Sequence, residues 1–167
     1  QILDNRFIEI SSSTIRRMLV FGCAESYLAP GVLARIQTEK LYGVGEDLKH
    51  LPFAKLKEKS LALHKEKRVA HVIGCSETAA ALARRWGADE TDAARAGILH
   101  DVTKALDGPE QLRLCEKYGI MTDMFERTNT KLLHAKTGSA VAKEIFGEND
   151  AVCGAIYWHT TGKANMT

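Results

Sequence analysis

Hydrophobic and polar positions over the first 43 residues follow two different periods. Residues 6–10 alternate as a short half-buried strand does. Helical spacing then covers residues 11–22, where serine or threonine can cap the start and Gly22 can end the helix. Residues 30–43 repeat the helical pattern, beginning at Pro30, a residue favoured in the first turn. This part of the chain is therefore predicted to be a short α/β segment.

From residue 53 onwards the spacing is helical, and no segment alternates as a strand does. The helices predicted from this spacing and from capping residues cover residues 53–64, 66–86, 89–100, 107–119, 129–147 and 149–162. Between Gly43 and Pro52 the sequence is polar and rich in turn formers, which marks a boundary. The fold class is thus mainly all-α: an α/β remnant over residues 1–45, then a helical domain over residues 46–167.

Composition and charge give no support for a nucleic-acid-binding or membrane protein. The 167 residues are 45% hydrophobic and 26% charged, which suits one soluble domain with an extra piece. A net charge of +2 gives no reason to expect a nucleic-acid partner. No apolar run approaches the roughly 20 residues of a membrane helix, and no signal peptide is visible. Since the chain lacks an initial Met and stops shortly after a motif-rich stretch, we expect a fragment of a longer protein.

Cysteine usage indicates a reducing compartment. The four cysteines are widely spaced and form no Cys-x-x-Cys pair: Cys23, Cys75, Cys115 and Cys153. Three of them lie inside predicted helices. We therefore expect a cytoplasmic protein in which the cysteines are small core residues.

Four of the six histidines lie on apolar or small-residue stripes of four separate helices. They are His71, His100, His134 and His159, and each is expected to point inward. His50, in the polar linker, and His64, among lysines, are expected on the surface. A single inward histidine is more often a hydrogen-bonded core residue, but four rings would need four sets of buried partners. A shared metal site supplies them together, because imidazole is the commonest metal ligand.

Asp101 directly follows His100 and adds a carboxylate that can bridge two ions. A histidine-rich set with a carboxylate suits iron, manganese or zinc better than calcium or magnesium. Consecutive helix residues point about 100° apart, so both side chains reach one site only if the helix ends there or the metal lies between them. The β-branched Val102 and Thr103 favour an end. Lys104 either faces an anionic substrate such as phosphate or is a solvated surface lysine.

Four short motifs occur in order: RVAHV (68–72), GILHDVTK (97–104), HAKTGSA (134–140) and AIYWHTTG (155–162). Together they resemble the HD-domain superfamily and, more narrowly, the bacterial YqeK-type hydrolases, which split diadenosine tetraphosphate symmetrically into two ADP. The resemblance covers about residues 53–167. It implies a helical bundle around a two-metal centre, with iron as the first expectation and manganese or zinc as alternatives.

The resemblance also implies roles for individual residues. The implied metal ligands are His71, His100, Asp101, His134 and His159. Asp101 would bridge the ions and, with Lys104, carry the catalysis, while Lys104 and Arg68 would contact phosphates. The implied pocket beside His159 is formed by Thr160, Thr161 and Gly162. The family pattern has a further metal-binding aspartate downstream of HTTG, at a position after Thr167.

The N-terminal segments ISSSTIRRMLVFG (10–22) and YLAPGVLARIQTEKLYG (27–43) resemble the C-terminal end of bacterial nicotinate-nucleotide adenylyltransferases. That resemblance implies a nucleotide-phosphate site at a helix start, formed by Ser12, Ser13, Thr14 and Arg16. The alternative is an ordinary helix cap. The nucleotide-binding sheet and His-x-Gly-His motif of that family lie outside this sequence, so we expect no adenylate transfer and a parent protein that fuses both activities.

The expected chemistry is metal-assisted hydrolysis of a phosphoanhydride. Two cations would activate a water and clamp a phosphate, and Lys104 would offset charge on the phosphate oxygens. One alternative is an HD phosphohydrolase acting on another nucleotide: a monophosphate, a deoxynucleoside triphosphate or a cyclic nucleotide. The other is an inactive or regulatory helical domain that binds nucleotide or a partner. The expected partners are a nucleotide and, as an open option, a second copy of the chain in a homodimer, with no nucleic acid and no membrane.

Overall fold

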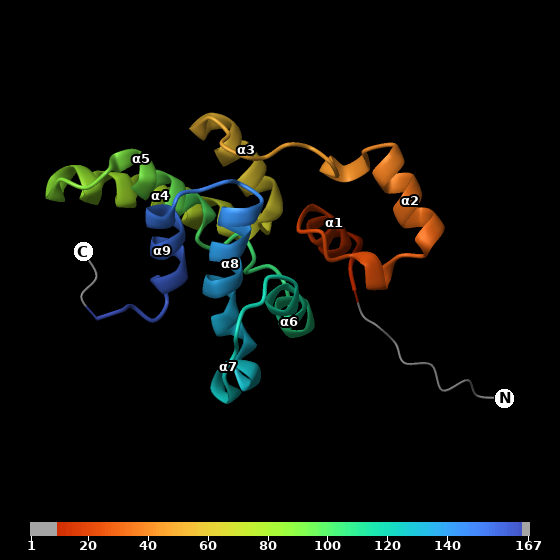
Figure 1. The fold of residues 1–167 in the computed structure, drawn as a ribbon. Helices are drawn as coiled ribbons and strands as arrows, with labels where there is room; N and C mark the ends of the chain where they lie inside the picture. The colour runs from red at the N-terminus through yellow and green to blue at the C-terminus, as the bar shows by residue number, and fades with distance from the viewer. Residues whose placement is uncertain (1–9, 165–167) are drawn as a thin grey trace. The chain divides into compact units, whose positions relative to one another are not determined.

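A computed structural model describes residues 10–164, and every regular element within them is a helix (Figure 1). The mainly all-α prediction is therefore confirmed for this part of the chain. The expected N-terminal α/β remnant is not seen. Its strand over residues 6–10 lies outside the described residues except for Ile10, which directly precedes the helix cap Ser11 and belongs to no strand.

The chain divides into two compact units, residues 1–45 and residues 46–167. The described part of the first unit holds two helices and two short 3₁₀ turns: α1 (Ser12–Val20), η1 (Glu25–Tyr27), α2 (Pro30–Thr38) and η2 (Leu41–Gly43). The second helix was expected to reach Gly43 but ends at Thr38, because Lys40 and Tyr42 take left-handed backbone angles that an α-helix excludes.

The second unit contains the remaining elements. They are α3 (Phe53–Leu63), α4 (Glu66–Trp86), α5 (Glu90–Leu99), α6 (Gly108–Lys117), α7 (Met124–Thr128), η3 (Thr130–Leu132), α8 (Leu133–Glu144) and α9 (Asp150–Trp158). Gly87 ends α4 in the left-handed conformation, with φ of 75°. Asp89 and Asn149 cap α5 and α9 by accepting hydrogen bonds from backbone N–H groups three residues on.

Helix α4 packs along α5, and α8 packs along α9, while α5 also contacts α9 (Figure 1). The α4–α5 approach is close at Gly97, where a Cβ atom would lie 2.5 Å from the Ser76 Cα. Ser76 donates a hydrogen bond from its hydroxyl to the Ala94 carbonyl at 2.8 Å across the same contact. The small residue Gly97 is thus required by the helix pairing that brings α4 and α5 together.

A buried apolar core joins these helices, and its fully buried members include Val72, Ile98, Leu99, Leu133, Val141 and Ile156. A buried ion pair adds to it: Arg95 on α5 meets Glu148, before α9, through two nitrogen–oxygen contacts of 2.7 and 2.6 Å. Arg95 also donates to the Leu51 carbonyl at 3.0 Å, which ties the segment before α3 to α5. Among residues 10–164, no helix has both the length and the apolar character needed to cross a membrane.

Candidate metal centre

The Asp101 carboxylate lies between two pairs of histidines and is 1% exposed. On one side, its Oδ2 atom lies 3.6 Å from His71 Nε2 and 3.3 Å from His100 Nε2. On the other side, its Oδ1 atom lies 3.3 Å from His134 Nε2 and 3.7 Å from His159 Nε2. All five residues inferred as ligands are therefore brought to one place, and each carboxylate oxygen faces its own pair of imidazoles.

Helix ends bring these side chains together. Helix α5 ends at Leu99, and the chain continues as tight turns, with Lys104 N–H donating to the Asp101 carbonyl at 2.9 Å. His100 and Asp101 can therefore both face the centre, as expected if the helix ended there. His159 directly follows α9, and His134 lies in the first turn of α8.

A buried hydrogen-bond network, which the sequence analysis missed, holds the turn after Asp101. The Thr103 hydroxyl donates to the His134 carbonyl at 3.1 Å and lies 2.9 Å from the Thr137 hydroxyl. Gln111 donates from its side-chain amide to the Thr103 carbonyl at 2.7 Å. These bonds fix the His-Asp turn against α6 and α8. The sequence feature that could have indicated this network is Thr137 in the HAKTGSA motif, a polar residue on the inward face of its helix.

Three of the rings are oriented by the same contact. The Nδ1 atoms of His100, His134 and His159 each lie within 2.8 Å of the backbone carbonyl three residues earlier. A carbonyl only accepts hydrogen bonds, so each Nδ1 carries the proton and donates it. The Nε2 atoms that face Asp101 are then left with a free lone pair, which is how a protein orients histidine toward a metal ion.

The electrostatics of the centre favour an anionic Asp101 carboxylate and a neutral His71 imidazole. Burial alone would raise the pKa of Asp101, but the ring nitrogens of His100, His134 and His159 that face it lower this pKa far below its usual range. Partial desolvation, and next the nearby Arg68 cation, lower the pKa of His71. Both shifts favour the form of these two side chains that can ligate a cation.

The donor geometry fits two divalent ions. The buried Asp101 Oδ1 atom accepts no hydrogen bond from the described residues, although two imidazole nitrogens face it. Those nitrogens, of His134 and His159, lie 3.1 Å apart, and those of His71 and His100 lie 3.3 Å apart. Ligands held at about 2.0–2.1 Å from a tetrahedral ion are separated by about 3.3–3.4 Å. One ion beside each carboxylate oxygen would satisfy both groups of donors.

Two basic side chains flank the centre. Arg68 forms an ion pair with Asp101 Oδ2, and Lys104 Nζ lies 3.5 Å from Oδ1. Lys104 Nζ also lies 3.0 Å from His134 Nε2. Each Asp101 oxygen thus has a positive side chain beside it, an arrangement suited to an anionic ligand.

A cavity of about 550 Å³ opens beside the centre, and it is lined by Arg68, Lys104 and Thr160, three of the residues that the sequence analysis predicted to contact substrate. Much of the remaining wall is alanine. Thr161 instead lines a second cavity, next to Trp158, and Gly162 closes a turn by donating its N–H to the Trp158 carbonyl at 2.8 Å. Of the three residues expected beside His159, the structure therefore brings only Thr160 to the cavity of the histidine cluster.

The residues inferred as a nucleotide site in the first unit lie at the start of α1. The helix is capped by Ser11, which accepts a hydrogen bond from Thr14 N–H at 3.1 Å, while Ser12 and Ser13 occupy the first turn. The Arg16 guanidinium lies 5.3 Å from the centre of the Tyr42 ring. These contacts are those of a capped helix.

Three expectations about burial were wrong. The His71 side chain is 47% exposed, because it lies at an open side of the cavity rather than inside the core. Cys75, one turn further along α4, also lines this cavity instead of packing in the core. His64 is buried, since it ends α3 with its Nε2 3.4 Å from the Ser60 hydroxyl, while the neighbouring Lys65 remains exposed.

Comparisons with known proteins also indicate an HD domain. The family model for the HD domain matches residues 68–166. A Halalkalibacterium halodurans protein named bis(5'-nucleosyl)-tetraphosphatase, symmetrical, is 40% identical over 104 residues, 61% of this chain and 54% of that protein. Proteins of the same name from Staphylococcus aureus and Bacillus subtilis are 34% and 32% identical; they match 66% and 61% of this chain, and 58% and 55% of their own lengths.

A solved structure from Clostridium acetobutylicum is also similar. It is described as a predicted HD superfamily hydrolase involved in NAD metabolism, and it is 32% identical with a TM-score of 0.66. The match covers 70% of this chain and 62% of that one. The chain therefore spans only a little more than half the length of the curated relatives it matches.

Proposed function

This chain belongs to the HD domain family, and on that premise we propose that it is a metal-dependent hydrolase that cleaves a dinucleoside tetraphosphate symmetrically. The observation that carries the proposal is the buried Asp101 carboxylate with a pair of histidine nitrogens facing each of its oxygens. The substrate class is supported by the relatives named symmetrical bis(5'-nucleosyl)-tetraphosphatases.

The ligands divide into two sets around Asp101. His71 and His100 would hold one divalent ion on the Oδ2 side, and His134 and His159 would hold the other on the Oδ1 side. When bound, such ions lower the pKa of a water and clamp a phosphate group. Iron is the ion we propose, and manganese and zinc suit the same nitrogen and oxygen donors.

Arg68 and Lys104 would bind the substrate phosphates. In the chain without ions, both are drawn to the Asp101 charge. Once that charge is offset by bound cations, the guanidinium and ammonium groups become available to phosphate oxygens at the cavity wall. Lys104 then stabilises the negative charge that develops on these oxygens in the transition state.

Symmetrical cleavage requires attack at one of the two inner phosphorus atoms of diadenosine tetraphosphate. The water oxygen bonds to that phosphorus, and the bridging oxygen between the inner phosphates leaves with the other half, so one water and one substrate give two ADP. The cavity beside the centre, about 550 Å³, falls within the usual range of about 300–1,000 Å³ for ligand pockets. Its alanine-rich wall offers an apolar surface to one nucleoside half.

For the first unit, we propose that residues 1–45 are a remnant of a nicotinate-nucleotide adenylyltransferase. Support comes from the sequence resemblance and from the capped start of α1, where Ser12, Ser13 and Thr14 lie in a first turn without acidic residues. A titration of the chain with nicotinate mononucleotide, compared with a Ser13→Glu variant, tests this assignment. Equal binding by both, or binding by neither, would contradict a nucleotide site at this helix.

The test of the main proposal is product analysis by chromatography. Diadenosine tetraphosphate is incubated with the chain and iron(II) or manganese(II), using wild type, Asp101→Asn and the control Asp107→Asn. Asp107 is an exposed residue that precedes α6, where asparagine is equally favoured. We expect ADP as the only nucleotide product from wild type and control, and none from Asp101→Asn. AMP with ATP would contradict symmetrical cleavage, and nucleotide binding without turnover would favour an inactive domain.

A further inference from the structure

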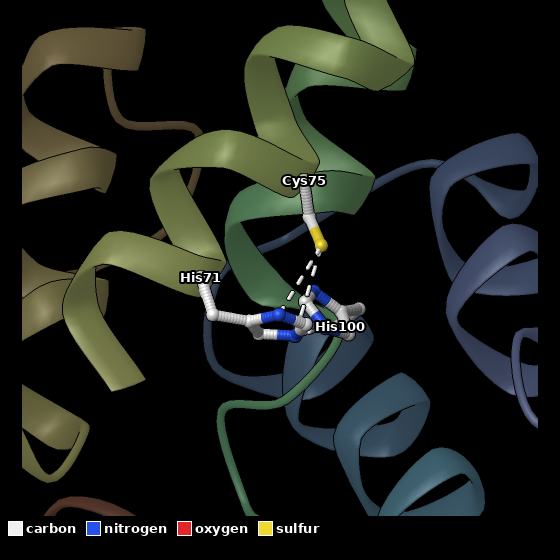
Figure 2. A group of neighbouring side chains, drawn as sticks. All are labelled: His71, Cys75 and His100. Atoms are coloured by element: carbon white, nitrogen blue, oxygen red, sulfur yellow. Dashed lines mark hydrogen bonds between the residues drawn. The ribbon is translucent and has the colours of Figure 1, made fainter. Parts of the chain in front are cut away.

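Cys75 places a thiol beside the histidine pair on the Oδ2 side of Asp101. It lies on α4 one helical turn after His71, so both side chains share one face of the helix. Figure 2 shows both residues projecting from α4 toward the ring of His100, which follows α5. The Cys75 Sγ atom lies 3.6 Å from His71 Nε2, and the donor atoms of all three residues lie within 4.8 Å of one another.

The two separations that involve His71 Nε2 match edges of one tetrahedral metal site. For metal–nitrogen bonds of about 2.0–2.1 Å and a metal–sulfur bond of about 2.3 Å, a nitrogen and a sulfur ligand lie about 3.6 Å apart, and two nitrogens about 3.4 Å apart. The observed values are 3.6 Å for His71 Nε2 to Cys75 Sγ and 3.3 Å for His71 Nε2 to His100 Nε2. Two edges of such a site are thus present, and the third, between Cys75 Sγ and the His100 donor atom, lies within 4.8 Å.

Cys75 differs from the other cysteines of the described chain. Cys23, Cys115 and Cys153 are buried, whereas Cys75 is partly exposed and lines the cavity of the centre. Burial raises the pKa of both Cys115 and Cys153 to about 11, which keeps these thiols protonated and unreactive. Cys75 is thus the thiol placed to meet an ion that enters the cavity.

We propose that Cys75 is a thiolate ligand of the metal position formed by His71 and His100. Binding releases the thiol proton to solvent and forms the metal–sulfur bond. Two imidazoles and a thiolate favour zinc or cobalt(II) over manganese at this position, and they leave a fourth place for an oxygen donor. Among the described residues, the second group of donor atoms, formed by His100, Asp101 and His159, holds no cysteine, so the two positions would differ in metal preference. This inference rests on the proposed metal centre for its location.

The test uses cobalt(II) as a spectroscopic probe of the full chain. A cobalt–thiolate bond gives charge-transfer absorption in the near ultraviolet that nitrogen and oxygen ligands do not give. We expect this band in wild type and in the control Cys115→Ala, and its loss in Cys75→Ser with unchanged far-ultraviolet circular dichroism. A wild type that binds cobalt without the band, or a Cys75→Ser variant that keeps it, would overturn the proposal.

Alkylation provides a second readout that does not depend on turnover. Iodoacetamide labelling, mapped by mass spectrometry, should modify Cys75 in the chain without ions, and zinc should block the reaction. His71→Ala should lose this protection, since one of the three donors is removed. Zinc that leaves Cys75 labelling unchanged would contradict the ligand role.

The outcomes for this inference and for the proposed function are separable. A protein that shows the Cys75-dependent band but cleaves no dinucleoside tetraphosphate overturns the proposed function and leaves the thiolate ligand standing. A protein that cleaves this substrate but gives no band overturns the thiolate ligand alone.

Discussion

At the scale of single residues, the charges near Asp101 and the orientation of the surrounding imidazole rings account for cation binding. A buried carboxylate is costly unless partners offset its charge. Here the guanidinium of Arg68 and the ammonium group of Lys104 supply positive charge beside it. The contacts of three Nδ1 atoms with backbone carbonyls decide that the Nε2 lone pairs face this carboxylate. The centre is therefore built for cations before any cation arrives.

Lys104 is expected to act on the substrate and not as a holder of the ions. Lys104→Ala should keep metal binding, because all imidazole and carboxylate donors remain, while hydrolysis of diadenosine tetraphosphate falls by roughly 10²–10³-fold. The control is Lys67→Ala, which changes an exposed lysine that does not line the cavity. Metal content and steady-state rates separate the two roles. Loss of bound ion in Lys104→Ala would contradict this assignment.

Metal binding should depend on pH through the histidines. The pKa of His71 is lowered from its ordinary 6.5, so this ring stays neutral and able to ligate at neutral pH. As the pH falls, protons compete with the ion for the ring nitrogens, and affinity decreases. Calorimetric titration of manganese at a series of pH values measures this. We expect manganese affinity to be constant from about pH 7.5 to 8.5 and to fall below about pH 6. An affinity that is unchanged at about pH 5 would contradict histidine ligation.

At the scale of elements, close pairing of α4 with α5 sets the distance between His71 and His100. Gly97 allows that approach, and a Cβ atom there would meet the Ser76 backbone at 2.5 and 2.9 Å. Neither contact can be relieved by a side-chain rotation. The helix pair would have to separate, and the two imidazoles would separate with it.

Gly97→Ala should therefore destabilise the chain by about 1–3 kcal/mol and weaken metal binding together. The control is Gly74→Ala on α4, where an added Cβ meets nothing within 4 Å. That change should stabilise the helix by up to about 1 kcal/mol, since alanine is the better helix former. Urea midpoints and metal titrations measure both effects. Equal effects of the two substitutions would contradict the close-packing argument.

Most element ends could be predicted because a local residue decides them. Gly87 ends α4, and Asp89 and Asn149 cap the helices that follow them, all within one turn. Helix α7 was missed, since five residues are too few for periodicity; a reciprocal cap between Asp123 and Glu126 holds it. Such a short element depends on side-chain bonds that a hydrophobic pattern does not record.

Burial was harder to predict than helix position, because it depends on which neighbours cover a face. The stripe of His71, Cys75 and Leu82 has helical spacing, but it borders cavities and leaves Leu82 50% exposed. His64 is buried although lysines surround it in sequence. Sequence spacing shows which residues share a face, and only the packing of the helices decides whether that face is covered.

At the scale of the molecule, the second unit gathers its functional groups from four helices that are distant in sequence. The five ligand candidates could be named from their sequence motifs. The hydrogen-bond network of Thr103, Gln111 and Thr137 that fixes the His-Asp turn could be identified only from the structure. The HD domain match begins at Arg68, within α4, and continues through α9. The site is thus a property of the whole helical unit and of no single segment.

The most direct test of the account is the number of divalent ions bound per chain. Elemental analysis after equilibration with iron(II) would compare wild type, Asp101→Asn and the control Asp107→Asn. The account predicts two ions in wild type and in the control, and loss of bound ion in Asp101→Asn, because both positions share that carboxylate. Two ions retained by Asp101→Asn, or no ion in wild type, would contradict a metal centre bridged by Asp101.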